Sequence, residues 1–205
     1  MKQSSWWCVC LAMAIALGTG AHAAEPAAPA YKLGQKIVPP AGTASQPKLN
    51  VREIAWEALV PKDWDPMKRF RTTDLSAFGD ADPRAEALLR EMREAWDNAP
   101  VVPALDRQLV RIPGFVVPLE QTKEGIREFL LVPYFGSCIH TPAPPSNQII
   151  HVILQRPVAW LAPMTPIWLE GPLEVHRADS LMAVSSYRVV NASVTKYEAP
   201  VPGTR

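Results

Sequence analysis

The stretch QLVRIPGFVVPLE, residues 108–120, decides the fold class, because strand-like periodicity begins here and continues to the end of the chain. Prolines and β-branched residues in this run disfavour a long helix. Gly114 stands in the middle of the run, at a position where a strand bulges or coils tightly. The stretch therefore predicts a strongly bent strand in a small sheet.

Four further strands are predicted after it. They cover residues 127–135, 147–154, 166–176 and 187–199. The 166–176 strand again contains a glycine, Gly171, and follows a short irregular connection. A barrel of the OB type needs five strands, a strongly coiled first strand and an insert between the third and fourth. We predict a mainly β, OB-like five-stranded barrel with one N-terminal amphipathic helix; a β-sandwich is the alternative.

The helix is predicted between Asp82 and about Asn98. Asp82 is a suitable N-cap, Pro83 suits the first helical position, and Glu86 is favourable to the helix dipole. Apolar residues recur at steps of three and four and form one stripe, namely Ala85, Leu88, Leu89, Met92 and Trp96. We expect this stripe to pack on the core, with the helix over an open end of the barrel.

The N-terminus has the composition of an export signal. Lys2 precedes an apolar stretch over residues 6–17, and residues 21–23 fit the small-x-small pattern that signal peptidase cleaves. The apolar stretch is shorter than the roughly 20 residues needed to span a bilayer, so no stable membrane insertion is expected after cleavage. We predict a signal peptide over residues 1–23, a flexible linker over 24–49 and a single β-rich domain over 50–205. Cleavage after Ala23 would release a periplasmic protein.

Export determines how the cysteines and the charge are interpreted. Cys8 and Cys10 leave with the signal, so Cys138 has no internal partner for a disulfide. The formal net charge of +1 falls to zero when Lys2 is removed. A neutral chain gives no electrostatic reason to expect binding to nucleic acid or to an acidic membrane surface.

The segment around Cys138 holds the candidate metal ligands. In an extended segment, Cys138 and His140 would point to the same side, and thiolate with imidazole suits zinc or copper. His151 would join them if the intervening segment turns back, and His176 is a further candidate. The predicted metal ligands are Cys138, His140 and His151. A strong zinc motif has paired Cys/His couples, whereas this sequence has one couple and isolated histidines.

Two other interpretations of the same segment stay open. Cys138 with His140 would be the nucleophile and the base of a thiol-dependent redox or hydrolytic enzyme. Alternatively, Cys138 is a small buried residue and the prolines stiffen an exposed docking segment that Asn147 ends. The predicted ligand- or partner-binding loop comprises Gly136, Cys138, His140, Pro144, Pro145, Asn147 and Gln148.

Several strings of this sequence resemble a family of exported bacterial proteins catalogued as a domain of unknown function, number 3299. They are GFVVPLE, FLLVPYFGSCIHTPAPPSNQIIHV, WLEGPLEV and YRVVNASV, and the likeness covers roughly residues 50–200. The family's string falls on Gly136, Cys138, His140, Pro142, Pro144, Pro145, Asn147 and Gln148, with Ala143 where proline is more usual. The resemblance implies export and transporter components as neighbours; it supplies no activity.

Together these features lead us to expect a non-enzymatic periplasmic accessory or binding protein. The resemblance suggests a link to an ABC-type transport system and to the handling of a transition metal, zinc or copper, with membrane transporter components as partners. The thiol-dependent enzyme using Cys138 and His140 is one alternative. A purely structural envelope protein is another.

Overall fold

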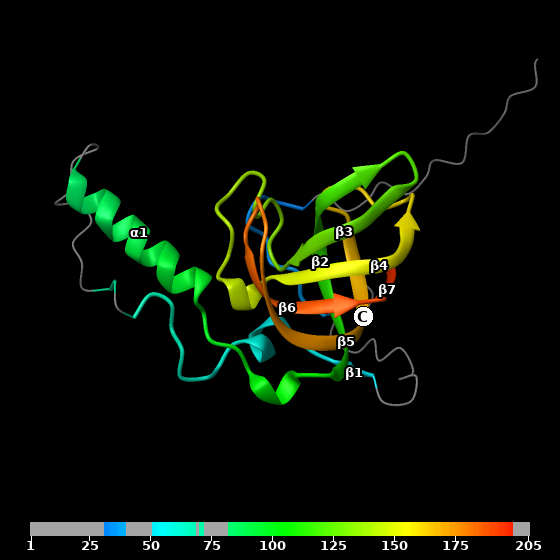
Figure 1. The fold of residues 1–205 in the computed structure, drawn as a ribbon, viewed down its shortest axis with the longest axis horizontal. Coiled ribbons are helices and arrows are strands. Elements are labelled where there is room, and N and C mark those ends of the chain that lie inside the picture. Colours follow the sequence, from blue (N-terminus) through cyan, green and yellow to red (C-terminus); the bar gives the residue numbers. More distant parts are fainter. Residues whose placement is uncertain (1–30, 40–50, 69, 72–81, 199–205) are drawn as a thin grey trace, which may run out of the picture. The chain divides into compact units, whose positions relative to one another are not determined.

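The protein, seen in a computed structural model, is a closed β-barrel. The structure describes residues 31–39, 51–68, 70–71 and 82–198. The barrel strands are β2 (Gln108–Thr122), β3 (Gly125–Val132), β4 (Ile150–Val158), β5 (Pro166–Asp179) and β6 (Val184–Val190). Their order is β2-β3-β4-β6-β5, and β5 pairs again with β2 to close the barrel (Figure 1).

The strand pairings are those of an OB barrel. All barrel neighbours are antiparallel except the third and fifth strands, β4 and β6, which run parallel. Two short strands, β1 (Arg52–Glu53) and β7 (Ser193–Lys196), are added to β2 and β5. The predicted mainly β, five-stranded barrel is therefore confirmed, and the two sheets of the alternative sandwich do not occur in the described residues.

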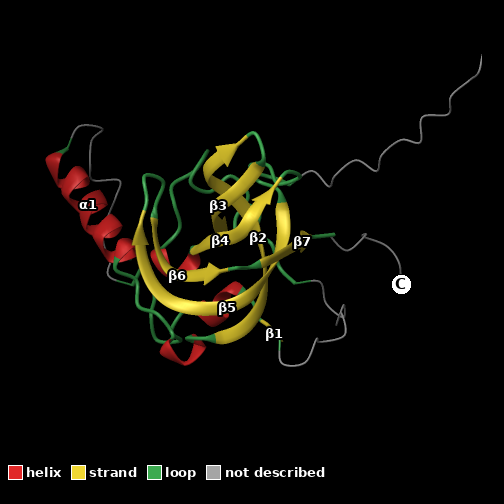
Figure 2. Ribbon diagram, turned by 45° about the vertical axis from the view of Figure 1, so that its right-hand side comes forward, coloured by secondary structure: helices red, strands yellow, loops and turns green. Residues whose placement is uncertain are grey.

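β2 closes the barrel, because it pairs with two neighbouring strands one after the other along its length. Its first half pairs with β5 and its second half with β3, and Phe115 has a partner on both sides. Gly114 lies at this change-over, where a Cβ atom would come 2.5 Å from the Leu131 Cγ atom of β3. The absence of a side chain lets β3 pack against the bend, as the sequence predicts for a coiled first strand. β5, by contrast, curves along its whole length (Figure 2).

Segments that precede the strands fill the barrel's core. The 3-10 helix Trp56–Leu59 contributes two buried side chains, and that of Trp56 is only 1% exposed. The Trp56 indole donates to the carbonyl of Pro113, beside the bend of β2, at 2.7 Å. Tyr187, fully buried on β6, donates its hydroxyl to the Leu59 carbonyl at 2.8 Å and accepts from the Val102 amide at 2.8 Å. Tyr187 thus holds two segments that precede the strands against the barrel, one at Leu59 and one at Val102.

Residues 31–39, which the sequence places in the flexible linker 24–49, are part of the folded domain. Ile37 is buried in the core, and its amide donates to the Pro133 carbonyl at 2.8 Å. Tyr31 packs edge-on against Phe115 with ring centroids 5.0 Å apart. The physical reason for the difference is that a few apolar side chains in a proline-rich segment suffice to dock it on an existing core, and local composition does not reveal that core.

The helix α1 (Pro83–Asp97) has the predicted ends but not the predicted role. Asp82 caps it by accepting from the Arg84 amide at 2.8 Å, and Asn98 follows its last turn. No residue of α1 is buried, so its apolar stripe is not core, contrary to our expectation. The core is completed by Trp56 and its neighbours instead. The described residues contain no helix that is both long and apolar enough to cross a bilayer.

We predict that Gly114→Ala destabilises the fold by about 1–3 kcal/mol, because the new methyl group overpacks against Leu131. Urea unfolding followed by tryptophan fluorescence measures the loss. Leu131→Ala in the same chain removes the atoms that clash, so the double variant should be more stable than the sum of the two losses implies. Strict additivity would contradict the role given to Gly114.

Tyr187→Phe should cost about 1–3 kcal/mol, because it leaves a buried carbonyl and a half-buried amide without a partner. Tyr134→Phe is the matched control: Tyr134 is half-buried, and its described contacts include the ammonium group of Lys36 over its ring but no bond to its hydroxyl. The control should change the free energy of unfolding by less than about 0.5 kcal/mol. Equal losses in both variants would refute the tie assigned to Tyr187.

Candidate functional site

The segment that contains Cys138 is a tight turn rather than an extended strand. The Gly136 carbonyl accepts from the amides of Ile139, His140 and Thr141 at 3.3, 2.8 and 3.1 Å. Gly136 and Cys138 both have positive φ, +87° and +64°, which is the left-handed region. The argument that residues two apart share one side therefore does not apply to Cys138 and His140.

The turn sends Cys138 and His140 into different surroundings. Cys138 is half-buried and lines a cleft beside α1. His140 is exposed and is not among the residues that line this cleft; a Cβ atom built on Gly136 would lie 3.7 Å from the His140 Cβ and 2.2 Å from the Leu33 Cδ1. His140 thus lies beside Gly136 and outside the lining of the cleft to which Cys138 contributes.

The cleft beside Cys138 has a volume of about 620 Å³ and three walls. One wall is α1, the second is the Cys138–Pro144 segment, and the third is the turn 180–184, which joins β5 to β6 and includes the first residue of β6. Its lining is mainly apolar, and only Arg93 and Asp97 carry charge. Leu89 is 64% exposed and Leu181 is fully exposed, so apolar side chains also stand at the rim.

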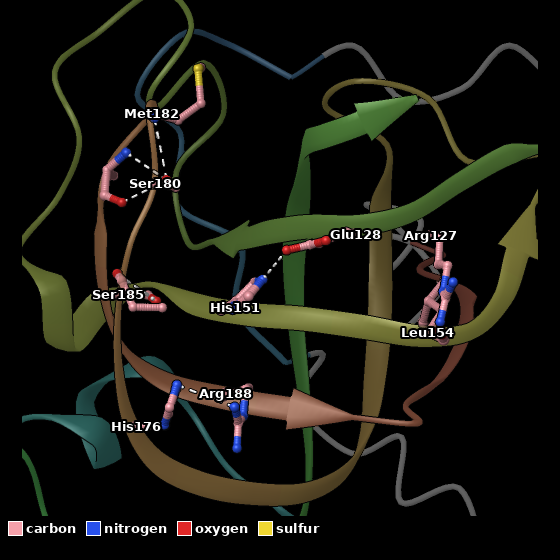
Figure 3. Close-up of polar contacts among 11 residues, drawn as sticks. Arg127, Glu128, His151, Leu154, His176, Ser180, Met182, Ser185 and Arg188 are labelled. Atoms are coloured by element: carbon pink, nitrogen blue, oxygen red, sulfur yellow. Dashed lines mark hydrogen bonds and ion pairs between the residues drawn. The ribbon is translucent and has the colours of Figure 1, made fainter. Parts of the chain in front are cut away.

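Hydrogen bonds fix the backbone of two walls of the cleft, the β5–β6 turn and the C-terminal end of α1. In the β5–β6 turn, the Ser180 hydroxyl donates to the Ala183 carbonyl at 2.7 Å and accepts from the amides of Met182 and Ala183 at 3.3 and 3.1 Å (Figure 3). The end of α1 is held where the Arg177 guanidinium donates to the Asp97 carbonyl. Both walls therefore have a defined backbone, while the side chains at the rim stay exposed.

The Cys138 thiol is not activated. Burial raises the pKa of Cys138 to about 11, so the thiol is protonated at neutral pH. In the described residues the His140 ring makes no hydrogen bond to it, and no cation lowers its pKa. An enzymatic nucleophile needs an adjacent base or a depressed pKa, and this geometry provides neither.

The other histidines lie on barrel strands, His151 on β4 and His176 on β5. His151 on β4 places its Nε2 2.7 Å from the Glu128 Oε1 of β3, and its buried Nδ1 has no partner. His176 accepts from Arg188 at 3.2 Å (Figure 3). Arg188 also pairs with Glu174. Within the described ranges, no three His, Cys, Asp or Glu side chains are grouped to hold a metal, so Cys138, His140 and His151 do not form the expected site.

The expected loop divides into an exposed part and a structural part. Asn147 and Gln148 are buried; their amide groups donate to the carbonyls of Pro100 and Trp56, each at 2.8 Å. They join the loop to the arms that fill the core, so they are not available to a ligand. Pro144 lines the cleft together with Cys138, while Pro145 leads into the buried 3-10 helix Ser146–Gln148.

Sequence reasoning found one wall of this cleft and missed the other two. The α1 stripe was visible as a periodic pattern, but pattern alone does not distinguish a stripe that faces the core from one that faces a cleft. The exposed pair Leu181 and Met182 lies in the turn between two strands. Two adjacent apolar residues in a short turn are the feature of the sequence that could have indicated this wall. Only the pairing of β5 with β6 places that turn opposite α1.

We expect Cys138 to react with iodoacetamide at pH 8 about a hundredfold more slowly than an ordinary exposed cysteine, because so little thiolate is present. The rate should rise about tenfold per pH unit from pH 7 to 9.5, since the raised pKa lies above this window. Mass spectrometry of the adduct measures the rate, and protein unfolded in urea is the control that restores ordinary reactivity. A rate that levels off near neutral pH would show an activated thiol.

Comparisons with known proteins agree with this fold. The family model described as "Protein of unknown function (DUF3299)" matches residues 56–196. The chain is also similar to a crystal structure of a DUF3299 family protein from Pseudomonas aeruginosa, at 37% identity and a TM-score of 0.56. The match covers 74% of this chain and 99% of that one. No curated protein matches this chain.

Proposed function

Because this chain belongs to the DUF3299 family, whose description names no activity, we propose from its own geometry that it is a non-enzymatic binding protein. The binding site is the cleft between α1, the Cys138–Pro144 segment and the turn 180–184. The protein acts in the periplasm, after export through the signal in residues 1–23, as an accessory of a membrane transport system. The partner that binds in the cleft is a component of that transport system.

The observation that carries this proposal is the incompletely buried apolar face of α1. An amphipathic helix in a globular domain normally gains its stability by burying its apolar stripe. Here none of the residues of α1 is buried, and the side chains of Leu89 and Met92 line an open cleft instead. On the opposite wall, Leu181 is fully exposed. A cleft with apolar walls and rim is typical of a surface that buries part of another molecule.

The chemistry of the cleft favours binding over catalysis. Its thiol is protonated at neutral pH, and its two charged residues, Arg93 and Asp97, belong to one helix. A catalytic site needs titratable groups whose environments poise them for proton transfer. The thiol-dependent alternative with Cys138 and His140 therefore has no support in this geometry.

Site-specific photo-crosslinking in cells that export the protein tests the proposal. Benzoylphenylalanine in place of Leu181 should give an adduct that mass spectrometry identifies as a component of a membrane transport system. Leu109 is the control position, because it is exposed to a moderate degree and does not line the cleft. Adducts that are the same from both positions, or none from Leu181, would count against the cleft as the binding site.

The same cells test export. The periplasmic fraction should contain a chain that begins at Ala24, read by N-terminal sequencing. Full-length chain in the cytoplasm would refute the location while leaving the cleft itself untouched.

A further inference from the structure

A fully exposed leucine stands at the rim of the apolar cleft. Leu181 lies in the β5–β6 turn, and this turn is itself one wall of the cleft of about 620 Å³. We infer that two copies of this chain associate through this face with twofold symmetry, the Leu181 side chain of each copy entering the cleft of the other. The inference goes beyond the proposed function, because it states what covers the cleft when no transport component is bound.

The β5–β6 turn presents Leu181 on an ordered backbone. The Ser180 hydroxyl accepts from the Met182 amide at 3.3 Å (Figure 3). The same hydroxyl donates to the Ala183 carbonyl at 2.7 Å, and the Ser180 amide donates to that carbonyl at 3.1 Å. An apolar side chain on an ordered turn loses little backbone entropy when it is bound, and its burial in an apolar pocket is favourable. Leu181 is therefore a preorganised anchor for a second copy.

The two charges that line the cleft are complementary to themselves under a twofold rotation. Arg93 and Asp97 lie one turn apart on α1, and among the residues that the structure describes neither side chain has an ion-pair partner. In an isologous contact, residue i meets residue j of the other copy and residue j meets residue i. Two α1 helices that cross antiparallel at the level of Ala95 place Arg93 of each copy opposite Asp97 of the other, with about 6 Å of helix between the two contacts. Both charged groups then gain a partner that their own chain does not supply.

The common location of Leu181 and the cleft selects a dimer over a filament. An exposed apolar group that fits a pocket elsewhere on the surface leaves a free end after every contact, so that further copies add. Here both lie on one face, so two copies complete each other and the contact closes. The formal charge of the chain is zero once Lys2 is removed with the signal, so long-range repulsion does not oppose the pairing.

The dimer and the complex with a transport component exclude each other, because both use the cleft and its rim. Leu89 is 64% exposed and Leu181 is fully exposed in a single chain. The second copy keeps these side chains out of water until a transport component displaces it. The dimer is in this respect the resting form of the protein.

Sedimentation velocity of the chain without its signal, residues 24–205, tests the inference at concentrations from about 1 to 500 µM. The sedimentation coefficient should rise from that of a monomer to that of a dimer, with a dissociation constant on the order of micromolar for a small interface. Leu181→Ser should raise this constant about tenfold or more. Leu109→Ser is the matched control: it changes a moderately exposed leucine outside the cleft and should alter the constant by less than about twofold.

Charge reversal identifies the pairing of the two helices. Arg93→Asp and Asp97→Arg should each weaken the dimer about tenfold, because each sets like charges opposite one another at two places. The two changes in one chain restore opposite charges and should return the dissociation constant to within about threefold of the wild type. Thermal unfolding checks that every variant keeps its fold. A chain that stays monomeric at about 500 µM, a dimer that Leu181→Ser leaves unchanged, or a double variant no tighter than the single reversals would each overturn the inference.

The result is separable from the proposed function, because the purified chain contains no transport component. A monomeric chain that still gives an adduct with a transport component from position 181 in cells would refute the dimer and leave the binding cleft in place. A dimer with the expected charge-reversal pattern, and an adduct only between two copies of the chain, would support the inference and refute the transport partner.

Discussion

The double pairing of β2 is the constraint on which the rest of the structure depends. One strand hydrogen-bonds to β5 with its first half and to β3 with its second half, and this alone turns an open sheet into a barrel. The bend requires a position with no side chain, because the Leu131 side chain of β3 occupies the space where a Cβ atom of Gly114 would stand. Closure in turn brings β4 and β6 together in parallel, although 25 residues separate the end of β4 from the start of β6 in the chain.

Closure also determines where the loops meet. The turn of Cys138 follows β3, and the turn 180–184 joins β5 to β6, so the two are distant in sequence. The barrel brings both to the cleft that α1 completes. The buried side-chain amides of Asn147 and Gln148 donate to the carbonyls of Pro100 and Trp56. These bonds anchor the end of the loop that begins at Cys138 to segments that pack on the core. The exposed surface of this loop is therefore carried by a rigid base, which is the arrangement that binding sites favour.

The position of the cysteine illustrates how a turn changes its chemistry. In an extended strand Cys138 would share a side with His140, but a left-handed backbone separates them. Burial then raises the pKa of the thiol to about 11, so the thiol is protonated at neutral pH. The structure thus places this residue in the lining of the cleft, which does not include the imidazole next to it in sequence.

The sequence by itself determined the barrel class and the limits of the helix, because strand periodicity, a mid-strand glycine and an Asp-Pro cap act locally. It also marked Cys138 as unusual. Only the tertiary structure decided that α1 stays unburied, that residues 31–39 belong to the domain, and that His151 pairs with Glu128 rather than with Cys138. These outcomes depend on which distant segments fill the core and which face each other after closure, and such contacts leave no local pattern for composition or spacing to reveal.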